Sequence, residues 1–202
     1  MPPRSASSVL VLAMLTLLLA PRTEAQSGAK ALFAGPAGST ANPFAPVGIQ
    51  YWFENGQGAR FARARDAGVG ARVRLHVQSN TDGFLGVWRT DGSQEGMELT
   101  PGGEWAGYRI EAHHDYAVPA EITVPARGSA TRVLILFARS QTEQVRTAAQ
   151  AREKIRRVSM VRARDGASAI VQEADTSTPG QIGTYVVHRM GAQPGVEIEI
   201  GA

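Results

Sequence analysis

Strand-length apolar runs, separated by turn residues at intervals of about 8–12 positions, constrain the fold of this chain most strongly. The clearest run is Arg72–Ser79 (RVRLHVQS), in which apolar and polar side chains alternate. Because neighbouring side chains of a strand point to opposite faces, this alternation predicts a strand with one buried face. Thr-Asp-Gly turns begin at Thr81 and again at Thr90. This close spacing indicates an antiparallel meander.

The whole pattern contains ten runs with strand character and predicts eight or nine short strands and one helix. Thr131–Ala138 is the most continuous apolar run after the first 25 residues, which predicts a central strand. Ile49–Glu54 ends at Asn55-Gly56, a dipeptide typical of two-residue hairpin turns. Ser140 and Glu143 have the spacing of a capping box, and an alanine stripe follows them, which predicts a helix over about 140–158. The other runs with strand character are 84–89, 97–99, 105–112, 120–124, 168–173, 185–189 and 196–200.

These elements predict a mainly β fold, namely an antiparallel β-sandwich or an open barrel, with one helix packed against it. We expect a single β-rich domain over residues 47–202. Its parts are a core at 49–140, the helix at 140–158 and C-terminal strands within 168–200. Residues 26–46 are rich in alanine, glycine, proline and serine, which predicts a flexible leader before this domain.

Residues 1–25 have the layout of a secretory signal peptide. Arg4 precedes the apolar run Val9–Ala20, and Thr23 and Ala25 supply small residues before a cleavage point at Gln26. A membrane anchor is the alternative, but a spanning helix needs about 20 apolar residues. We therefore expect an exported protein that is periplasmic or extracellular after cleavage.

Composition excludes several kinds of chemistry. The 202 residues contain no cysteine, which rules out disulfides, thiolate metal sites, a cysteine nucleophile and a lipid-acylated N-terminus. The net charge of +3 is too small to indicate nucleic-acid binding. Nucleophile-elbow and phosphate-loop motifs do not occur, and we expect no cofactor.

His113-His114-Asp115 is the strongest candidate for chemistry in the sequence. In a loop these residues could converge on a metal ion, with His76 or His188 completing the ligand set. On a strand, adjacent side chains would point to opposite faces and could not converge. The alternative, which we favour, is a polar turn without catalytic function.

Two further groups are weaker candidates for binding. Trp52, Trp88 and Trp105 lie on predicted strands, where they could line a groove, although large aromatic residues are more often part of the core. The other group lies in the basic stretch 141–164, which could contact an anionic membrane surface or be covered by the acidic stretch 165–202. We favour coverage by the acidic stretch. The candidate binding residues in the basic stretch are Arg152, Arg156 and Arg157.

The order of strands and turns between Ile49 and Ser140 resembles a bacterial family, the domain of unknown function 4384. The similarity lies in the opening strand GIQYWFEN, in Arg72–Val77, in the turn and strand Ser79–Trp88, and in Met97–Pro101. Val118-Pro119 and Arg132–Ser140 complete it. The resemblance implies an accessory or interaction module in an exported or envelope protein, and it supplies no catalytic residues. Many exported relatives look like lipoproteins, whereas this chain has no cysteine to acylate.

From these observations we expect a non-catalytic exported protein of the cell envelope that binds another envelope protein or a surface polymer. An exposed sheet edge is a natural place for a peptide partner, because its backbone amides are unpaired. A metal-dependent hydrolase using His113, His114 and Asp115 is the alternative. The sequence does not determine the oligomeric state.

Overall fold

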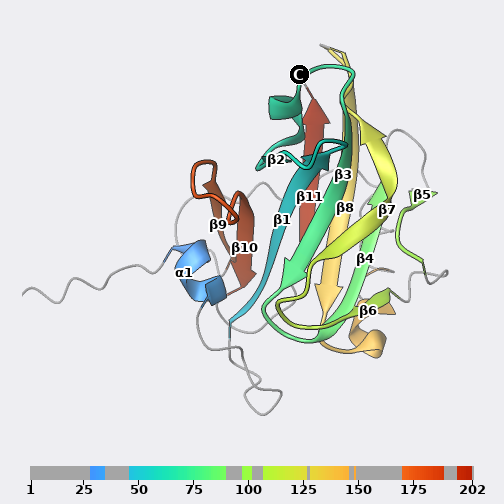
Figure 1. Ribbon diagram of the computed structural model, residues 1–202. Helices are drawn as coiled ribbons and strands as arrows, with labels where there is room; N and C mark the ends of the chain where they lie inside the picture. The colour runs from blue at the N-terminus through green and yellow to red at the C-terminus, as the bar shows by residue number, and fades with distance from the viewer. Residues whose placement is uncertain are drawn as a thin grey trace, which may run out of the picture.

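The computed structural model places two antiparallel β-sheets face to face as a β-sandwich, with α1 beside the β9–β10 hairpin (Figure 1). The structure describes residues 28–34, 46–89, 97–101, 107–126, 128–145, 148, 170–188 and 195–201. The predicted fold class is therefore confirmed, and of its two forms the structure adopts the sandwich. Within the described residues, no helix has the length and apolar character needed to cross a membrane.

The six-stranded sheet has the strand order β7-β3-β1-β10-β9, with the short β2 paired to β1. Its strands are β1 (Val47–Asn55), β2 (Arg60–Phe61), β3 (Arg72–Ser79), β7 (Tyr116–Thr123), β9 (Ile170–Asp175) and β10 (Gly183–His188). A short 3-10 helix, η1 (Ala64–Ala67), connects β2 to β3. Every strand pair in this sheet is antiparallel.

The five-stranded sheet has the order β11-β8-β4-β5, with β6 also paired to β4. Its strands are β4 (Gly83–Arg89), β5 (Met97–Glu98), β6 (Tyr108–Ile110), β8 (Ala130–Ala138) and β11 (Gly195–Gly201). The predicted central position of the 131–138 run is confirmed, because β8 lies between β11 and β4.

The core lies between the two sheets and consists of the inward side chains of both. Each large apolar side chain that is fully buried there contributes about 1.5–3 kcal/mol relative to exposure. The inward residues alternate with outward ones, as sheet packing requires. Those of the four main strands are Ile49, Tyr51, Phe53, Val73, Leu75, Val77, Leu85, Val87, Val133, Ile135 and Phe137.

The helix predicted over 140–158 is described only at its start, where residues 141–145 and 148 are helical. The Glu143 amide donates to Ser140 Oγ, which is one half of the predicted capping box. Ala148 packs with Trp88, Leu134 and Leu136 on the outer face of the five-stranded sheet, as expected for a packed helix.

Two local predictions were wrong. The Asn55-Gly56 turn is not a two-residue hairpin, because β2 begins only at Arg60. Asn55 Oδ1 accepts from the amides of Gln57 and Ala59, so its side chain organises a longer loop. The strand predicted to begin at Ala120 starts at Tyr116 instead; Pro119 is accommodated because β7 is an edge strand with a register shift.

The flexible leader predicted over 26–46 needs a correction. The helix α1 (Ala29–Ala34) lies within that range, and Ala29 and Phe33 are buried against Tyr185 and Val187 of β10. Apolar side chains at positions i and i+4 give this short segment a face that packs on the sheet, which the low-complexity composition concealed. The signal peptide predicted over 1–25 lies outside the described residues and remains a prediction.

Candidate functional site

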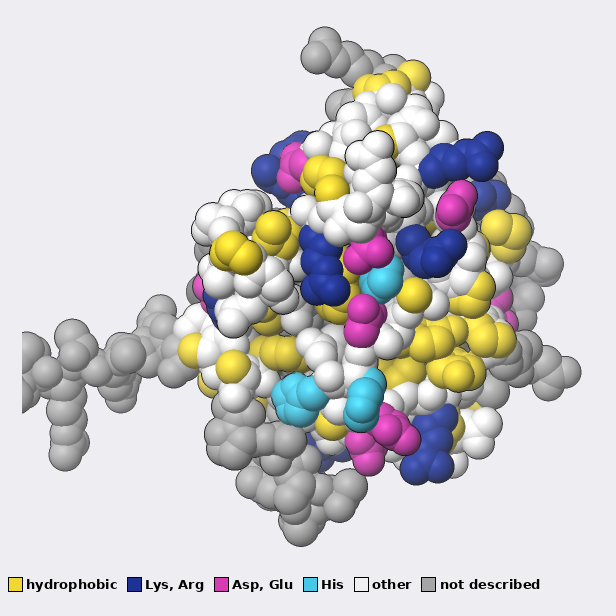
Figure 2. Space-filling view, in the orientation of Figure 1, with side chains coloured by type: hydrophobic (Ala, Val, Ile, Leu, Met, Phe, Trp, Pro, Cys, Tyr) yellow, Lys and Arg dark blue, Asp and Glu magenta, His cyan; other side chains and the backbone are white. Residues whose placement is uncertain are grey.

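Four of the ion pairs between described residues lie on the outer face of the six-stranded sheet, over β1, β3 and β7. At one end of this face, α1 contacts β1 as well as β10. Figure 2 shows arginine or lysine, acidic and histidine side chains close together on it. We call it the Trp52 face, and it consists of Trp52, Glu54, Arg60, Arg72, Arg74, His76, Asp115 and Glu121.

A row of alternating charges runs across four strands of this face. Glu54 is in register with Arg60 on one side and with Arg74 on the other, and Arg74 is in register with Glu121. Arg60 Nε lies 3.6 Å from Glu54, and Arg74 lies 3.7 Å from Glu121. Pairs as exposed as these contribute about 0–1 kcal/mol each. Their main consequence is a charge pattern that alternates along a flat surface.

Trp52 lies beside this row and is covered on both sides, although it points to the outer face. Its ring stacks on His76 with a centroid distance of 5.2 Å and an interplanar angle of 22°. The Arg60 guanidinium lies 4.7 Å from the Trp52 ring centroid, within the range of a cation–π contact. The residue is 2% exposed, and its Nε1 has no hydrogen-bond partner among the described residues. The indole is therefore a covered part of the sheet surface.

His76 and Asp115 form the closest ionisable pair on this face. His76 Nδ1 lies 2.8 Å from Asp115 Oδ1, and the His76 side chain is 10% exposed. Such a contact holds the imidazole ring in one orientation. A catalytic triad would also need a nucleophile at the second ring nitrogen. Within the described chain, no hydroxyl group is hydrogen-bonded to His76 Nε2.

The three candidate ligands His113, His114 and Asp115 turn to different partners. The His113 ring packs edge-on against Phe33, His114 Nδ1 lies 3.5 Å from Glu111, and Asp115 binds His76. Among the described residues, no three histidine or acidic side chains are placed to hold one metal ion. The three residues instead form the turn that leads into β7, where His113 adopts a φ of 58°.

The other sequence candidates divide into buried and undescribed residues. Trp88 is fully buried, and it belongs to the apolar cluster on the outer face of the five-stranded sheet. Trp105, Arg152, Arg156 and Arg157 lie outside the described residues.

A tyrosine pair joins the two sheets near the Trp52 face. Tyr116 of β7 stacks on Tyr108 of β6 with a centroid distance of 4.7 Å. Burial raises the pKa of Tyr116 to about 12, with a smaller contribution from neighbouring Tyr108. This phenol therefore stays protonated through the physiological range and is not poised for acid–base chemistry.

Sequence reasoning missed the assembly of Arg60, Trp52 and His76. Each belongs to a different strand, and only the register of β1 with β3 places Trp52 opposite His76. The signal that could have located it is the alternation of β3, which puts His76 on the polar face together with Arg72 and Arg74.

Comparisons with protein-family models, with curated proteins and with solved structures found no match for this chain.

Proposed function

We propose that this chain is a non-catalytic, exported binding module of the cell envelope and that the Trp52 face contacts its partner. The observation that supports this most directly is the pairing of the polar groups on that face. Arg60, Glu54, Arg74 and Glu121 form cross-strand pairs, and none of them converges with the others on a single point. Enzymes, in contrast, direct several groups at one reacting atom. The export signal predicted from the sequence over 1–25 agrees with this role.

A protein partner is favoured over a surface polymer. Sugar polymers commonly stack on an exposed aromatic ring, but Trp52 is 2% exposed and lies between Arg60 and His76. The alternating charges instead offer separate positions to the charged side chains of another protein. Side chains of the row are accessible, since Arg74 and Glu121 are 47% and 49% exposed. Electrostatic complementarity of this kind determines specificity and the rate of encounter.

Site-specific photo-cross-linking in cells that export the protein tests this proposal. A photo-cross-linking amino acid replaces Gln78, which lies on the same face of β3 as Arg74 but outside the charge row, or, as a matched control, Val145, which is 45% exposed at the start of the helix that follows β8. We expect one discrete protein adduct from position 78 and none from position 145. Equal adducts at both positions, or none at either, would contradict the proposal. A polysaccharide adduct at position 78 would favour the polymer instead.

Two further measurements test the hydrolase alternative and the export signal. Metal analysis of the purified protein should find no stoichiometric zinc. N-terminal sequencing of the exported form should begin at Gln26. One zinc ion per chain that is lost in the His113→Ala variant would support the hydrolase. An exported form that retains residues 1–25 would contradict signal cleavage.

The charge row itself is tested by a pair of substitutions. Glu121→Ala removes the partner of Arg72 and Arg74, and we expect it to weaken a cross-link from Gln78 on the same face at least tenfold. The matched control is Asp66→Ala, which breaks an exposed pair with Arg63 on η1 and should leave the cross-link unchanged. Equal effects of the two substitutions would show that the charge row does not contribute.

A further inference from the structure

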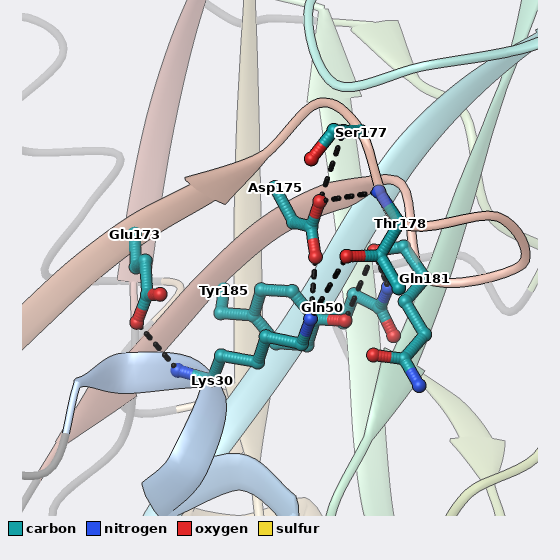
Figure 3. A network of polar contacts seen from close by, with 8 residues as sticks. All are labelled: Lys30, Gln50, Glu173, Asp175, Ser177, Thr178, Gln181 and Tyr185. Carbon is teal, nitrogen blue, oxygen red and sulfur yellow. Dashed lines mark hydrogen bonds and ion pairs between the residues drawn. The ribbon is translucent and has the colours of Figure 1, made fainter.

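The other half of the same sheet face, over β9 and β10, carries the short helix α1. Figure 3 shows Lys30 of α1 directed at the loop that connects β9 to β10. Lys30 Nζ donates to Asp175 Oδ2 and lies 3.5 Å from Thr178 Oγ1, while the Lys30 amide donates to Glu173 Oε2 at 3.0 Å. One lysine thus brings both its backbone and its side chain to acceptors on the hairpin.

The hairpin holds the Asp175 carboxylate in place through its own hydrogen bonds. Asp175 Oδ1 accepts from the amides of Ser177 and Thr178, at 3.0 and 2.9 Å, which leaves Oδ2 directed outward. Tyr185 Oη donates to Gln181 O at 3.1 Å, which fixes the ring that faces α1 (Figure 3). The receiving surface is therefore organised by its own hydrogen bonds, as expected of a pre-formed docking site.

Phe33 is the apolar anchor of α1. Its ring packs edge-on against Tyr185, with a centroid distance of 5.5 Å, and the residue is 5% exposed. Gly48 permits this approach, because a Cβ there would lie 3.2 Å from Phe33 Cδ2 and 2.7 Å from Val187 Cγ2. The surface thus combines a carboxylate that accepts a cation with an apolar area beside Gly48 that accepts an aromatic ring.

α1 cannot owe its helical form to its own sequence. It has six residues, whereas isolated helices shorter than about 12–15 residues are marginal in water. Its contacts with β10, β1 and β9 must therefore supply most of its stability. Residues 35–45 connect it to β1, and a chain of that length spans at most about 40 Å. Covalent attachment presents such a segment at an effective concentration on the order of millimolar.

We propose that the β9–β10 surface is a peptide-docking site that α1 occupies as an internal ligand. The external partner is a protein segment with a lysine followed, three residues later, by an aromatic residue, which is the spacing of Lys30 and Phe33. The carboxylates of Asp175 and Glu173 bind the lysine, and the apolar area beside Gly48 and Tyr185 binds the ring. The partner displaces α1. The β9–β10 surface therefore stays occupied by α1 until the concentration of the partner segment exceeds the effective concentration of α1. This site is separate from the Trp52 face.

The test uses the full chain and a fluorescent synthetic peptide of residues 26–36 (QSGAKALFAGP). In the Lys30→Ala/Phe33→Ala variant the internal ligand is weakened, and we expect the peptide to bind at least tenfold more tightly than to the wild type. Peptides that carry glutamate for the lysine, or alanine for the phenylalanine, should not bind. Adding Asp175→Asn, which keeps an oxygen for the loop amides but removes the charge, should abolish binding.

Three results would overturn the proposal. The first is equal peptide binding by the wild type and the folded variant, and the second is binding that Asp175→Asn leaves unchanged. The third is a wild-type dimer that becomes monomeric in the variant, because α1 would then be exchanged between two copies. If the variant does not fold, hydrogen exchange of the wild type tests whether α1 detaches from the β9–β10 surface. We expect the Leu32 amide to exchange at least 100-fold faster than the Val77 amide, and equal protection would refute a detachable α1.

Discussion

Gly86→Ala should destabilise the protein because Trp88 lies directly over Gly86 on β4. A Cβ at position 86 would be 1.9 Å from Trp88 Cη2 and 2.6 Å from Cζ3. The indole has no free direction in which to move, since it is fully buried against Leu134, Leu136 and Ala148. Overpacking of this kind costs about 1–3 kcal/mol. The loss of glycine freedom in the unfolded chain offsets about 0.4–1 kcal/mol of that cost. We therefore expect a net loss of about 1–2 kcal/mol.

A double-mutant cycle in urea identifies the cause of that loss. Trp88→Leu frees the space above residue 86, so in that background Gly86→Ala should cost less than about 0.5 kcal/mol. The matched control is Gly56→Ala, where an added Cβ would meet no atom within 4 Å. It should stabilise the protein by about 0.4–1 kcal/mol, since only the unfolded chain is affected. Additive costs of Gly86→Ala and Trp88→Leu would refute the reasoning, because the strain would then not lie between these two residues.

Three further predictions concern titration and the connection of β1 to the turn after β3. The Lys30 ammonium and the loop amides hold the pKa of Asp175 below its ordinary 3.8. The ion pair of Asp175 with Lys30 therefore stabilises α1 fully above about pH 4–5, and this stabilisation is lost as the pH falls further. Hydrogen exchange of the α1 amides should show this loss in the wild type and not in Asp175→Asn. The pKa of Tyr116 is raised to about 12, so its contribution to stability persists below pH 10 and is lost as the pH rises through 12; in an absorbance titration, Tyr116→Phe should remove a phenol that ionises near pH 12. Asn80→Ala should cost about 1–3 kcal/mol in urea unfolding, because the buried Asn80 Oδ1 accepts the Gly48 amide at 2.9 Å, and a value below 0.5 kcal/mol would contradict this role.

The fold could be predicted from the sequence because period-two alternation and turn residues act locally. The Arg72–Ser79 run became β3 with its predicted bounds, and its three apolar residues are fully buried. The continuous run at 131–138 became the central strand β8. The helix α1 could not be predicted in the same way, because six residues are too few to form a stable helix alone and this segment is stabilised by its packing on the hairpin of β9 and β10.

The Trp52 face and the β9–β10 surface both depend on strand register and not on spacing along the sequence. Motif reasoning therefore located neither of these two sites. His113, His114 and Asp115 are adjacent in the chain, yet their side chains contact three separate partners. Lys30 and Asp175 are far apart in the chain, yet they form one ion pair because β10 joins β1 and β9 in a single sheet. A polar residue on a half-buried strand is therefore better interpreted through its cross-strand neighbours than through its sequence neighbours. Applied to this sheet, that rule places a paired, open surface over β1, β3 and β7, and a surface over β9 and β10 that α1 already occupies.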